Sequence, residues 1–448
     1  MHLIEHARFA VKCCEKLGVD ELEAFAQSIQ TSEIVIERAE IQNERVKTQR
    51  GIGVRVTKSK KLGFSFTSVL TKESVEQACR NAVSLANVSL ANPDWVSLPS
   101  ATRLPRTPAG MFDKKTADMS ANDVLKLALK AYDAAKECDR RVTIDDGKFS
   151  VVCGDVAVVN SHGVEAEEKG TGLSGYLICV AKDKGEVSSM AYEYDVSRRL
   201  ADFSPKRIGK VAAERAVASL GPKSVESFTG KVIFDCDVAA EVVLQPVVAS
   251  VNADNVQRSR SLWAGKTGEQ VASEKVTMVD DGLMPKGVGS SRFDAEGVPC
   301  QKTPLITKGK LEGFLYNSFT ANKEKCKSTG NAFRAGYFGL PGIFVSNLVV
   351  KAGRKKLDEL VAEVDKGIIV RRFSGNVRPD NGEFSGIAKQ ASYIEKGEIK
   401  YPLKETMISG NAFQTLRNII EIGSETRATT FQAYVPPILV DNVNVVSK

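Results

Sequence analysis

The side chains best suited to acid–base or metal chemistry are unevenly distributed along this chain. Histidine occurs three times, at His2, His6 and His162, and the last cysteine is Cys326. Imidazole is the commonest metal ligand in proteins and the commonest general base near neutral pH. More than half of the 448 residues must therefore act without imidazole, and any chemistry there must use other groups.

The histidines themselves favour structural roles. His2 and His6 are four residues apart on an expected helix, which is ligand spacing, but no third ligand is near them in the sequence. A solvated helix face is the simpler interpretation. His162 follows Asn160 and Ser161 and precedes Gly163, so a hairpin turn is favoured over a base or a ligand. Asp280-Asp281-Gly282 could bind a cation, but the residues end a strand-like run and are expected to form a turn.

The sequence does not contain the residue spacing of known phosphate-binding, dinucleotide-binding or catalytic-nucleophile motifs. Gly265-Lys266-Thr267 resembles the end of a phosphate-binding loop, but Arg260 stands where the loop needs a glycine. Gly51 and Gly53 lack the third glycine of a dinucleotide-binding fingerprint, because position 56 is valine. No Gly-x-Ser-x-Gly nucleophile elbow occurs in the sequence.

Apolar periodicity in the first half predicts helices that flank strands. Helices are expected over 3–17, from a cap at Thr71, from a capping box at Ser120, and from Pro205 to Gly221. The second of these should turn Val75, Ala78, Ala82 and Leu85 inward. Strands are expected over 32–41, 156–159 and 176–180, with a hairpin that joins 51–56 to 62–67.

The second half is expected to be rich in strands. It opens with a strand over 231–234 and an apolar helical segment over 238–248, and it includes a hairpin at 394–399 and a last strand over 436–446. This segregation predicts an α+β fold, with an N-terminal helix-and-sheet domain followed by a mostly-β domain with large antiparallel sheets. The predicted boundaries are 1–91 for an N-terminal subdomain, 92–118 for a proline-rich linker, 119–221 for the second part of that domain, and 222–448 for the β-rich domain.

Composition is that of an ordinary globular protein. Hydrophobic residues make up 42% and charged residues 26% of the sequence. No apolar run is long enough to cross a bilayer, and the N-terminus lacks the pattern of a signal peptide, so a cytoplasmic protein without a membrane partner is expected. Nine cysteines without metal spacing favour reduced, mostly buried thiols. The net charge of +7 comes from scattered groups such as Arg371-Arg372, which favour solvated faces over nucleic-acid binding.

An ordered series of segments resembles one known family over nearly the whole chain. Trp263 to Ser273 is followed by Val276 to Gly282 and then by Arg292 to Pro299. Further segments in the same order are 51–56 with 62–67, 160–163, 303–306, 328–334, 382–385 and 408–411. Together they resemble the TldD/PmbA (TldE) family of zinc-dependent peptidase proteins, once called modulators of DNA gyrase.

That resemblance implies a vacated metal motif. TldD-like subunits carry His-Glu-x-x-x-His and a late cysteine, where two imidazoles and a thiolate hold zinc and the glutamate is the general base. Gln245, Pro246 and Ser250 occupy the matching positions here, so no metal, no cofactor and no catalytic residue is expected in this chain. Zinc is expected in a TldD-like partner.

A PmbA/TldE-like subunit is therefore the leading hypothesis. The resemblance implies a noncatalytic half of a heterodimer that processes unstructured peptides, supplying chamber walls and the partner interface, with a homodimer as an option in isolation. The candidates for the partner surface or peptide path are Trp263, Lys266 and Glu269, then Asn331 and Arg334. An autonomous hydrolase without zinc and a regulatory module for a nucleic-acid-associated protein remain as alternatives.

Overall fold

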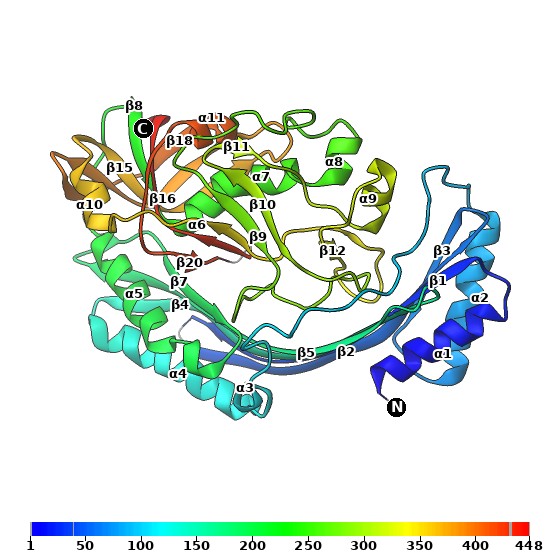
Figure 1. Ribbon diagram of the computed structural model, residues 1–448. Coiled ribbons are helices and arrows are strands. Elements are labelled where there is room, and N and C mark those ends of the chain that lie inside the picture. Colours follow the sequence, from blue (N-terminus) through cyan, green and yellow to red (C-terminus); the bar gives the residue numbers. More distant parts are fainter. Residues whose placement is uncertain (1, 39, 430–431, 448) are drawn as a thin grey trace.

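The computed structural model describes residues 2–38, 40–429 and 432–447, which form two lobes (Figure 1). The N-terminal lobe is built on one long, curved sheet whose strand order is β3-β2-β1-β4-β5, with β6 and β7 both paired to β5. The strands are β1 (Glu21–Glu37), β2 (Glu40–Lys58), β3 (Lys61–Thr67), β4 (Val142–Asn160), β5 (Glu165–Asp183), β6 (Glu186–Val187) and β7 (Ala191–Ser197). The C-terminal lobe lies on the concave face of this sheet (Figure 1).

Helices cover the convex face at both ends of the sheet. At one end are α1 (Leu3–Glu15) and α2 (Lys72–Val88); at the other are α4 (Ala121–Cys138) and α5 (Pro205–Ala218), with the short α3 (Lys114–Ala117) nearby. Successive residues of a strand point to opposite faces. In β1, the even-numbered Leu22 and Ala26 pack under α1 and α2, and Ile34 and Ile36 pack under α4 and α5. The odd-numbered residues consequently face the C-terminal lobe.

Local sequence signals account for where these helices begin. Thr71 accepts a hydrogen bond from the Ser74 amide at 3.2 Å, and Ser120 forms a capping box with Asp123. Pro205 is the first residue of α5. The predicted helix starts are confirmed. The predicted inward face of α2 was wrong at Leu85, which is 47% exposed, because the buried stripe drifts around the helix to Val83 and Ala86.

Two predicted hairpins are confirmed, and both use left-handed turn residues. Ser59 and Lys60, with φ of 51° and 61°, connect β2 to β3. Lys396 and Gly397, with φ of 49° and 76°, connect β16 (Glu383–Glu395) to β17 (Glu398–Pro402). Two positive φ angles are typical of the type I′ turn, whose twist matches that of the strands it joins.

The C-terminal lobe contains a sheet that closes on itself. Its order is β15-β8-β22-β18-β16-β17, β16 also pairs with β15, and β19 pairs with β22. The further strands of this sheet are β8 (Phe228–Phe234), β15 (Lys366–Val377), β18 (Thr406–Asn411), β19 (Ile419–Ile422) and β22 (Ile438–Ser447). The five strands β15, β8, β22, β18 and β16 thus form a closed ring, which removes free sheet edges among them.

A second sheet and short helices complete this lobe. The sheet order is β11-β10-β9-β14-β21-β20. Its strands are β9 (Met278–Asp281), β10 (Lys302–Thr307), β11 (Lys310–Leu311), β14 (Leu348–Val350), β20 (Arg427–Ala428) and β21 (Ala433–Val435); β12 (Ala332–Phe333) pairs with β13 (Gly342–Ile343). The helices are α8 (Ala253–Gln257), α9 (Ser318–Glu324), α10 (Leu357–Ala362) and α11 (Ala412–Arg417). Helix accounts for 24% and strand for 41% of the chain, which confirms the α+β class.

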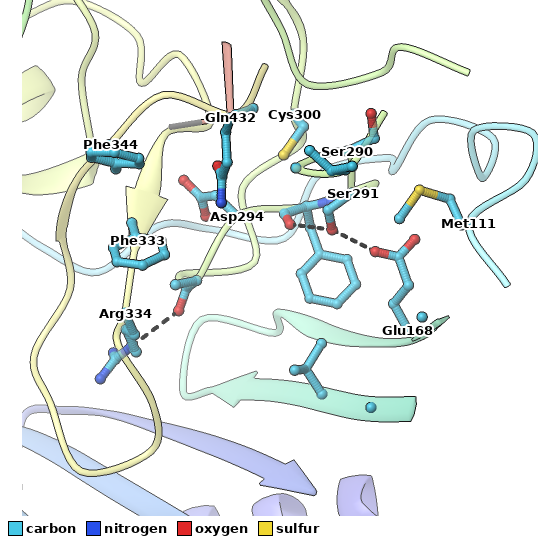
Figure 2. Close-up of a pocket in the computed structure, with 18 of the residues that line it drawn as sticks. Met111, Glu168, Ser290, Ser291, Asp294, Cys300, Phe333, Arg334, Phe344 and Gln432 are labelled. Carbon is cyan, nitrogen blue, oxygen red and sulfur yellow. Dashed lines mark hydrogen bonds between the residues drawn. The ribbon is translucent and has the colours of Figure 1, made fainter. Parts of the chain in front are cut away.

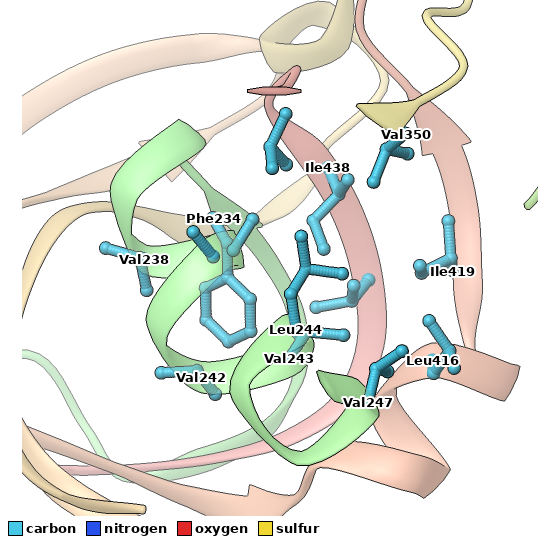
Figure 3. Close-up of a cluster of buried hydrophobic side chains, with 14 of the residues drawn as sticks. Phe234, Val238, Val242, Val243, Leu244, Val247, Val350, Leu416, Ile419 and Ile438 are labelled. Carbon is cyan, nitrogen blue, oxygen red and sulfur yellow. The ribbon is translucent and has the colours of Figure 1, made fainter. Parts of the chain in front are cut away.

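A broken helix crosses the main core of the C-terminal lobe. It consists of α6 (Cys236–Val238), a π-helical turn (Ala239–Leu244) and α7 (Gln245–Ser250). Val243, Leu244 and Val247 pack against Leu416 and Ile438 in this core (Figure 3). Pro246 lacks an N–H group and its ring would clash with a carbonyl four residues earlier, so the helix widens just before it. Among the described residues, no helix combines the length and the apolar character that crossing a membrane requires.

Candidate functional site

A cavity of about 590 Å³, here called the sheet cavity, lies between the concave sheet face and the C-terminal lobe. Phe25, Gln27 and Ile29 reach it from β1 because odd-numbered residues of that strand face this way. The loops of the C-terminal lobe supply the opposite wall (Figure 2). The labelled lining residues in that view are Met111, Glu168, Ser290, Ser291, Asp294, Cys300, Phe333, Arg334, Phe344 and Gln432.

The polar groups at one end of the sheet cavity already have protein partners. Glu168 accepts a hydrogen bond from the Ser291 hydroxyl at 2.5 Å. The Arg198 guanidinium donates to the carbonyls of Val288 and Ser290 at 2.5 and 3.1 Å. Burial raises the pKa of the Cys300 thiol well above its usual value, so the thiol stays protonated and a poor nucleophile. Most hydrogen-bonding groups of this wall are therefore already paired within the protein, and none of these residues is an activated nucleophile.

Four buried charges join the lobes beside this cavity and are called the Glu23 cluster. Arg55 donates to Glu23 at 2.7 Å and to Glu296 at 2.9 Å, and Arg334 also donates to Glu23. Each side chain is at most 5% exposed. Burial opposes charge on Glu296, but Arg55 outweighs it and holds the pKa of that carboxyl below its usual value. Two arginines and two carboxylates balance, as buried charge requires.

The loop that carries Arg334 is positioned by two buried aspartates. The Asn331 amide donates to Asp280 at 2.6 Å, and the Ala332 amide donates to Asp294 at 2.9 Å. Burial raises the pKa of Asp280 to about 6. Asp280 lies inside β9 and fixes this loop, so its placement in a turn was wrong; the predicted turn begins at Gly282, directly after the strand.

Two glycines allow this loop to approach the sheet. A Cβ atom on Gly51 would lie 2.4 Å from the Tyr337 ring, and one on Gly53 would lie 2.1 Å from the Tyr337 carbonyl oxygen. No real Cβ contact is that short. Gly51 and Gly53 thus allow the two lobes to come into contact. This contact explains why the strand carries two closely spaced glycines although they do not belong to a nucleotide-binding fingerprint.

A second set of charges, the Glu193 cluster, joins the lobes at the other end of the sheet. Glu193 on β7 accepts from Arg207 and Arg215, each at 2.9 Å, and from Arg427 of the C-terminal lobe. The Arg427 guanidinium lies 4.4 Å from the centre of the Tyr194 ring. Glu193 is fully buried, but the three arginines are 39%, 20% and 21% exposed.

The residues predicted to replace a metal motif lie together on α7. Pro246 and Ser250 are buried and Gln245 is half-buried. The Ser250 carbonyl accepts a hydrogen bond from Ser261 at 2.8 Å. An amide, a ring without a donor atom and a hydroxyl are poor zinc ligands, so the donor set on α7 does not fit a zinc ion. None of the three lines the sheet cavity.

The other predicted residues separate into two groups. Asn331 and Arg334 both line the sheet cavity, although each is held by a carboxylate. Trp263 is 3% exposed and packs edge-on against Phe413 with ring centres 5.7 Å apart. Lys266 is half-buried and Glu269 is exposed on the same loop. The structure therefore brings only the second pair to the cavity.

The histidines also have structural surroundings, but His6 is buried on α1 at 8% exposed, so the interpretation of a solvated helix face was wrong for that residue. His162 lies in the turn between β4 and β5, as predicted, and its Nε2 atom lies 3.0 Å from Glu21. Within residues 2–38, 40–429 and 432–447, no three His, Cys, Asp or Glu side chains are grouped to hold a metal ion.

Sequence analysis did not identify several residues that form the buried ionic contacts. Glu23 and Arg55 sit between apolar residues in strands, and Arg371 follows Ile368, Ile369 and Val370. A charged residue inside a buried strand is the available signal, since such residues are seldom buried without a partner. Arg371 and Arg372 are half-buried, so the interpretation of this pair as a solvated face was wrong.

Family comparisons agree with this architecture. Three models described as PmbA/TldA metallopeptidase domain 1, central domain and C-terminal domain match residues 22–86, 114–220 and 227–447. The chain therefore belongs to the PmbA/TldD metallopeptidase family. Metalloprotease PmbA of Escherichia coli O157:H7 is 26% identical over 87% of this chain and 84% of its own. An uncharacterised protein of Methanocaldococcus jannaschii is 29% identical over 92% and 93%.

Solved structures extend the similarity to the whole fold. TldE from Thermococcus kodakarensis has a TM-score of 0.90 at 25% identity, covering 97% of this chain and 98% of that chain. A putative modulator of a DNA gyrase from Thermotoga maritima has a TM-score of 0.90 at 26% identity and 99% coverage of both chains. These relatives share both lobes with the present chain.

Proposed function

We propose that this chain is a PmbA/TldE-like, noncatalytic subunit of a two-subunit metallopeptidase that processes unstructured peptides. The observation that carries the proposal is the donor set on α7, an amide, a ring and a hydroxyl at Gln245, Pro246 and Ser250, the positions that the family resemblance matches to two histidines and a glutamate. Zinc hydrolysis needs imidazole or thiolate ligands and a general base. The similarity to TldE over both lobes supports the same assignment.

In the proposed complex, a TldD-like partner supplies zinc and the catalytic glutamate. The present chain supplies walls of the chamber and part of the partner interface. Lys266 and Glu269 are suited to that interface because they lie on a loop with exposed positions. Asn331 and Arg334 shape the wall of the sheet cavity through the carboxylates that hold them. We place this assembly in the cytoplasm.

Metal content and peptidase activity test the proposal together. The purified chain should hold no stoichiometric zinc by elemental analysis and should not cleave an unstructured peptide. Addition of a TldD-like chain from the same genome should produce cleavage that a chelator abolishes. Zinc-dependent cleavage by this chain alone would contradict the proposal.

A pair of variants locates the chemistry. In the complex, replacing the glutamate of the partner's His-Glu-x-x-x-His motif by glutamine should abolish cleavage, since the general base is lost. Gln245→Ala in the present chain should leave the rate within about twofold, because its side chain takes no part in the reaction. A loss of activity with Gln245→Ala and normal complex formation would show that α7 does contribute to catalysis.

A further inference from the structure

The first half of β2 is a sheet edge without a neighbouring strand. β2 pairs with β1 along almost its whole length, but its ladder with β3 ends at the pair Ile52–Thr67. At the other end, the register with β1 shifts and leaves Gln42 as an extra residue. Residues 43–51 therefore form a regular edge, here called the β2 edge, and no strand in the described part of the chain pairs with it.

Solvent reaches both faces of the β2 edge. Residues 44–48 and Arg50 are exposed, and Gln49 is half-buried. Val46 is 58% exposed, whereas Ile52, farther along the same strand, is fully buried under α1 and α2. Neither the helices nor the C-terminal lobe covers the β2 edge, and it contains no proline. An uncovered edge strand of this length is a template for a further strand.

The backbone groups that face outward from the β2 edge follow from the hairpin to β3. The hairpin loop has two residues, so Lys58 and Lys61, which flank it, form a hydrogen-bonded pair. The N–H and C=O groups of Lys58 therefore point toward β3. Because these groups alternate in direction along an antiparallel strand, every even-numbered residue of the regular part of β2 points them the same way. In the β2 edge, the outward-facing groups belong to Glu44, Val46, Thr48 and Arg50.

Two side chains of the β2 edge carry charges that cannot pair with each other in one chain. Glu44 and Arg50 form no ion pair among the described residues. They project from the same face of the strand but are separated by about 20 Å along it. Arg45, on the other face, lies 3.9 Å from Glu33. An antiparallel strand with the same sequence would bring an arginine opposite Glu44 and a glutamate opposite Arg50.

A two-fold axis at Lys47 gives this self-complementary pairing. Lys47 is the central residue of the β2 edge, midway between the extra residue and the end of the β3 ladder. Pairing about this axis places Glu44 opposite Arg50 at two symmetric positions and Val46 opposite Thr48. Opposite charges and β-branched residues stabilise antiparallel strands when they lie directly opposite each other.

Neighbouring registers lack this complementarity. An axis at Val46 would place Arg45 opposite Lys47, which is a repulsive pair at two positions. An axis at Thr48 would place no opposite charges together and would require Ile52, which is already paired with β3. The sequence of the β2 edge therefore favours one register.

We propose that the β2 edge pairs with the β2 edge of a second copy of this chain, antiparallel about a two-fold axis at Lys47. The curved sheets of the two copies become one continuous sheet. Two Glu44–Arg50 ion pairs fix the register, while the two Lys47 side chains lie opposite each other and weaken the association. The proposal needs neither zinc nor a TldD-like subunit, so it goes beyond the proposed function and can fail separately from it.

Charge reversal tests the pairing in the full chain by analytical ultracentrifugation. The wild type should change from monomer to dimer between about 1 and about 100 µM. Glu44→Arg and Arg50→Glu should each weaken the dimer at least about tenfold, because each places like charges together at two positions. An equimolar mixture of the two variants should restore the dimer, since the mixed pair again opposes unlike charges.

Three results would overturn the proposal. They are a wild type that stays monomeric at about 100 µM, a dimer that survives both charge reversals, and a mixture that remains monomeric. The second result would place the second copy on another surface. Restoration in the mixture also shows that both variants are folded, so loss of structure cannot imitate the expected pattern.

A cysteine on the two-fold axis tests the register. Lys47 opposes itself in a non-hydrogen-bonded pair, where the Cα atoms lie about 4.5 Å apart, within reach of a disulfide. Lys47→Cys should therefore give a covalent dimer on a non-reducing gel after oxidation. Gln49→Cys is the matched control, because its two thiols would be on the order of 13 Å apart. The wild type controls for the exposed thiols of Cys138 and Cys326; equal cross-linking of the two variants would overturn the register.

Removal of the repulsion at the axis gives a change of opposite sign. Lys47→Thr should tighten the dimer about threefold or more, because it replaces two opposed charges by a pair of β-branched residues. A variant that only disturbed the strand would weaken the dimer instead. A weaker dimer with Lys47→Thr would contradict the axis at this residue.

Discussion

The two ionic clusters that join the lobes differ in how much water reaches them. In the Glu23 cluster, Arg55 and Arg334 are 5% and 1% exposed, and two carboxylates balance two guanidinium groups. In the Glu193 cluster, three arginines meet one fully buried glutamate, but each arginine is at least 20% exposed. Asp195, Asp235 and Asp237 also pair with these arginines, and water reaches the guanidinium groups. The two clusters therefore differ in their access to water: the ion pairs of the Glu23 cluster are shielded from solvent, whereas solvent screens those of the Glu193 cluster.

Removing the charge of Glu23 should have the largest effect. Glu23→Gln leaves Arg334 and one bond of Arg55 without a carboxylate in a buried place, which should lower the free energy of unfolding by about 3–5 kcal/mol. Urea denaturation measures the loss. Glu33→Gln is the control, because Glu33 lies on the same strand and pairs with Lys148 near solvent. If the two variants lost similar amounts of unfolding free energy, burial would not be the reason that the Glu23 ion pairs matter more than the Glu33 pair.

Removing the charge of Glu193 should cost less. Glu193→Gln leaves Arg207, Arg215 and Arg427 with partial access to water and with Asp195, Asp235 and Asp237 within 4.0 Å. We expect a loss of about 2 kcal/mol in the same denaturation experiment. High salt should reduce the difference from the wild type further. A loss larger than that of Glu23→Gln would invert the comparison.

The buried Asp280 makes the Glu23 side of the molecule sensitive to pH. Its folded pKa is about 6, whereas an unfolded aspartate has a pKa of about 3.9. The folded state therefore holds an extra proton on Asp280 between about pH 4 and pH 6. The stability that this proton contributes is present below this window and is lost as the pH rises through it. In urea denaturation across this range, the free energy of unfolding should rise less with pH for the wild type than for Asp280→Asn. Parallel slopes would contradict the raised pKa.

Close approach of the lobes at the Glu23 end can be tested without changing charge. Gly53→Ala would place a Cβ atom 2.1 Å from the Tyr337 carbonyl oxygen and should cost about 1–3 kcal/mol through overpacking. Gly172→Ala on β5 is the matched control, because the nearest atom to its added Cβ would be 3.9 Å away. The control should be neutral or stabilising, as judged by thermal unfolding. Equal effects would show that strand flexibility, not contact, decides the cost.

Elements with a strong local signal were predictable from the sequence. Thr71, Ser120 and Pro205 mark helix starts because capping and a missing N–H act within one turn of the backbone. The hairpins at 59–60 and 396–397 follow from turn chemistry. Leu85 was misplaced because a buried stripe drifts around a long helix, and the packing partner decides which residues it covers.

The candidate sites were less predictable, since their members are distant in sequence. Arg334 meets Glu23 across 311 residues, and no spacing rule connects them. Arg371, on β15, resembled a surface charge, but the end of α5 and the strands β16 and β17 partly cover it. Trp263, predicted from its motif as a candidate for an interface or a peptide path, lies in the core beside Phe413.

The sequence by itself determined the α+β class, the family resemblance and the chemistry available on α7, because backbone propensities and side-chain types are local properties of a chain. Tertiary structure alone decided which charges are buried, which are paired and which are left open. Burial sets the free energy of a charge through the water it excludes, and that exclusion depends on segments that meet only in the folded protein. Glu23, Glu193 and Asp280 acquire their roles in this way.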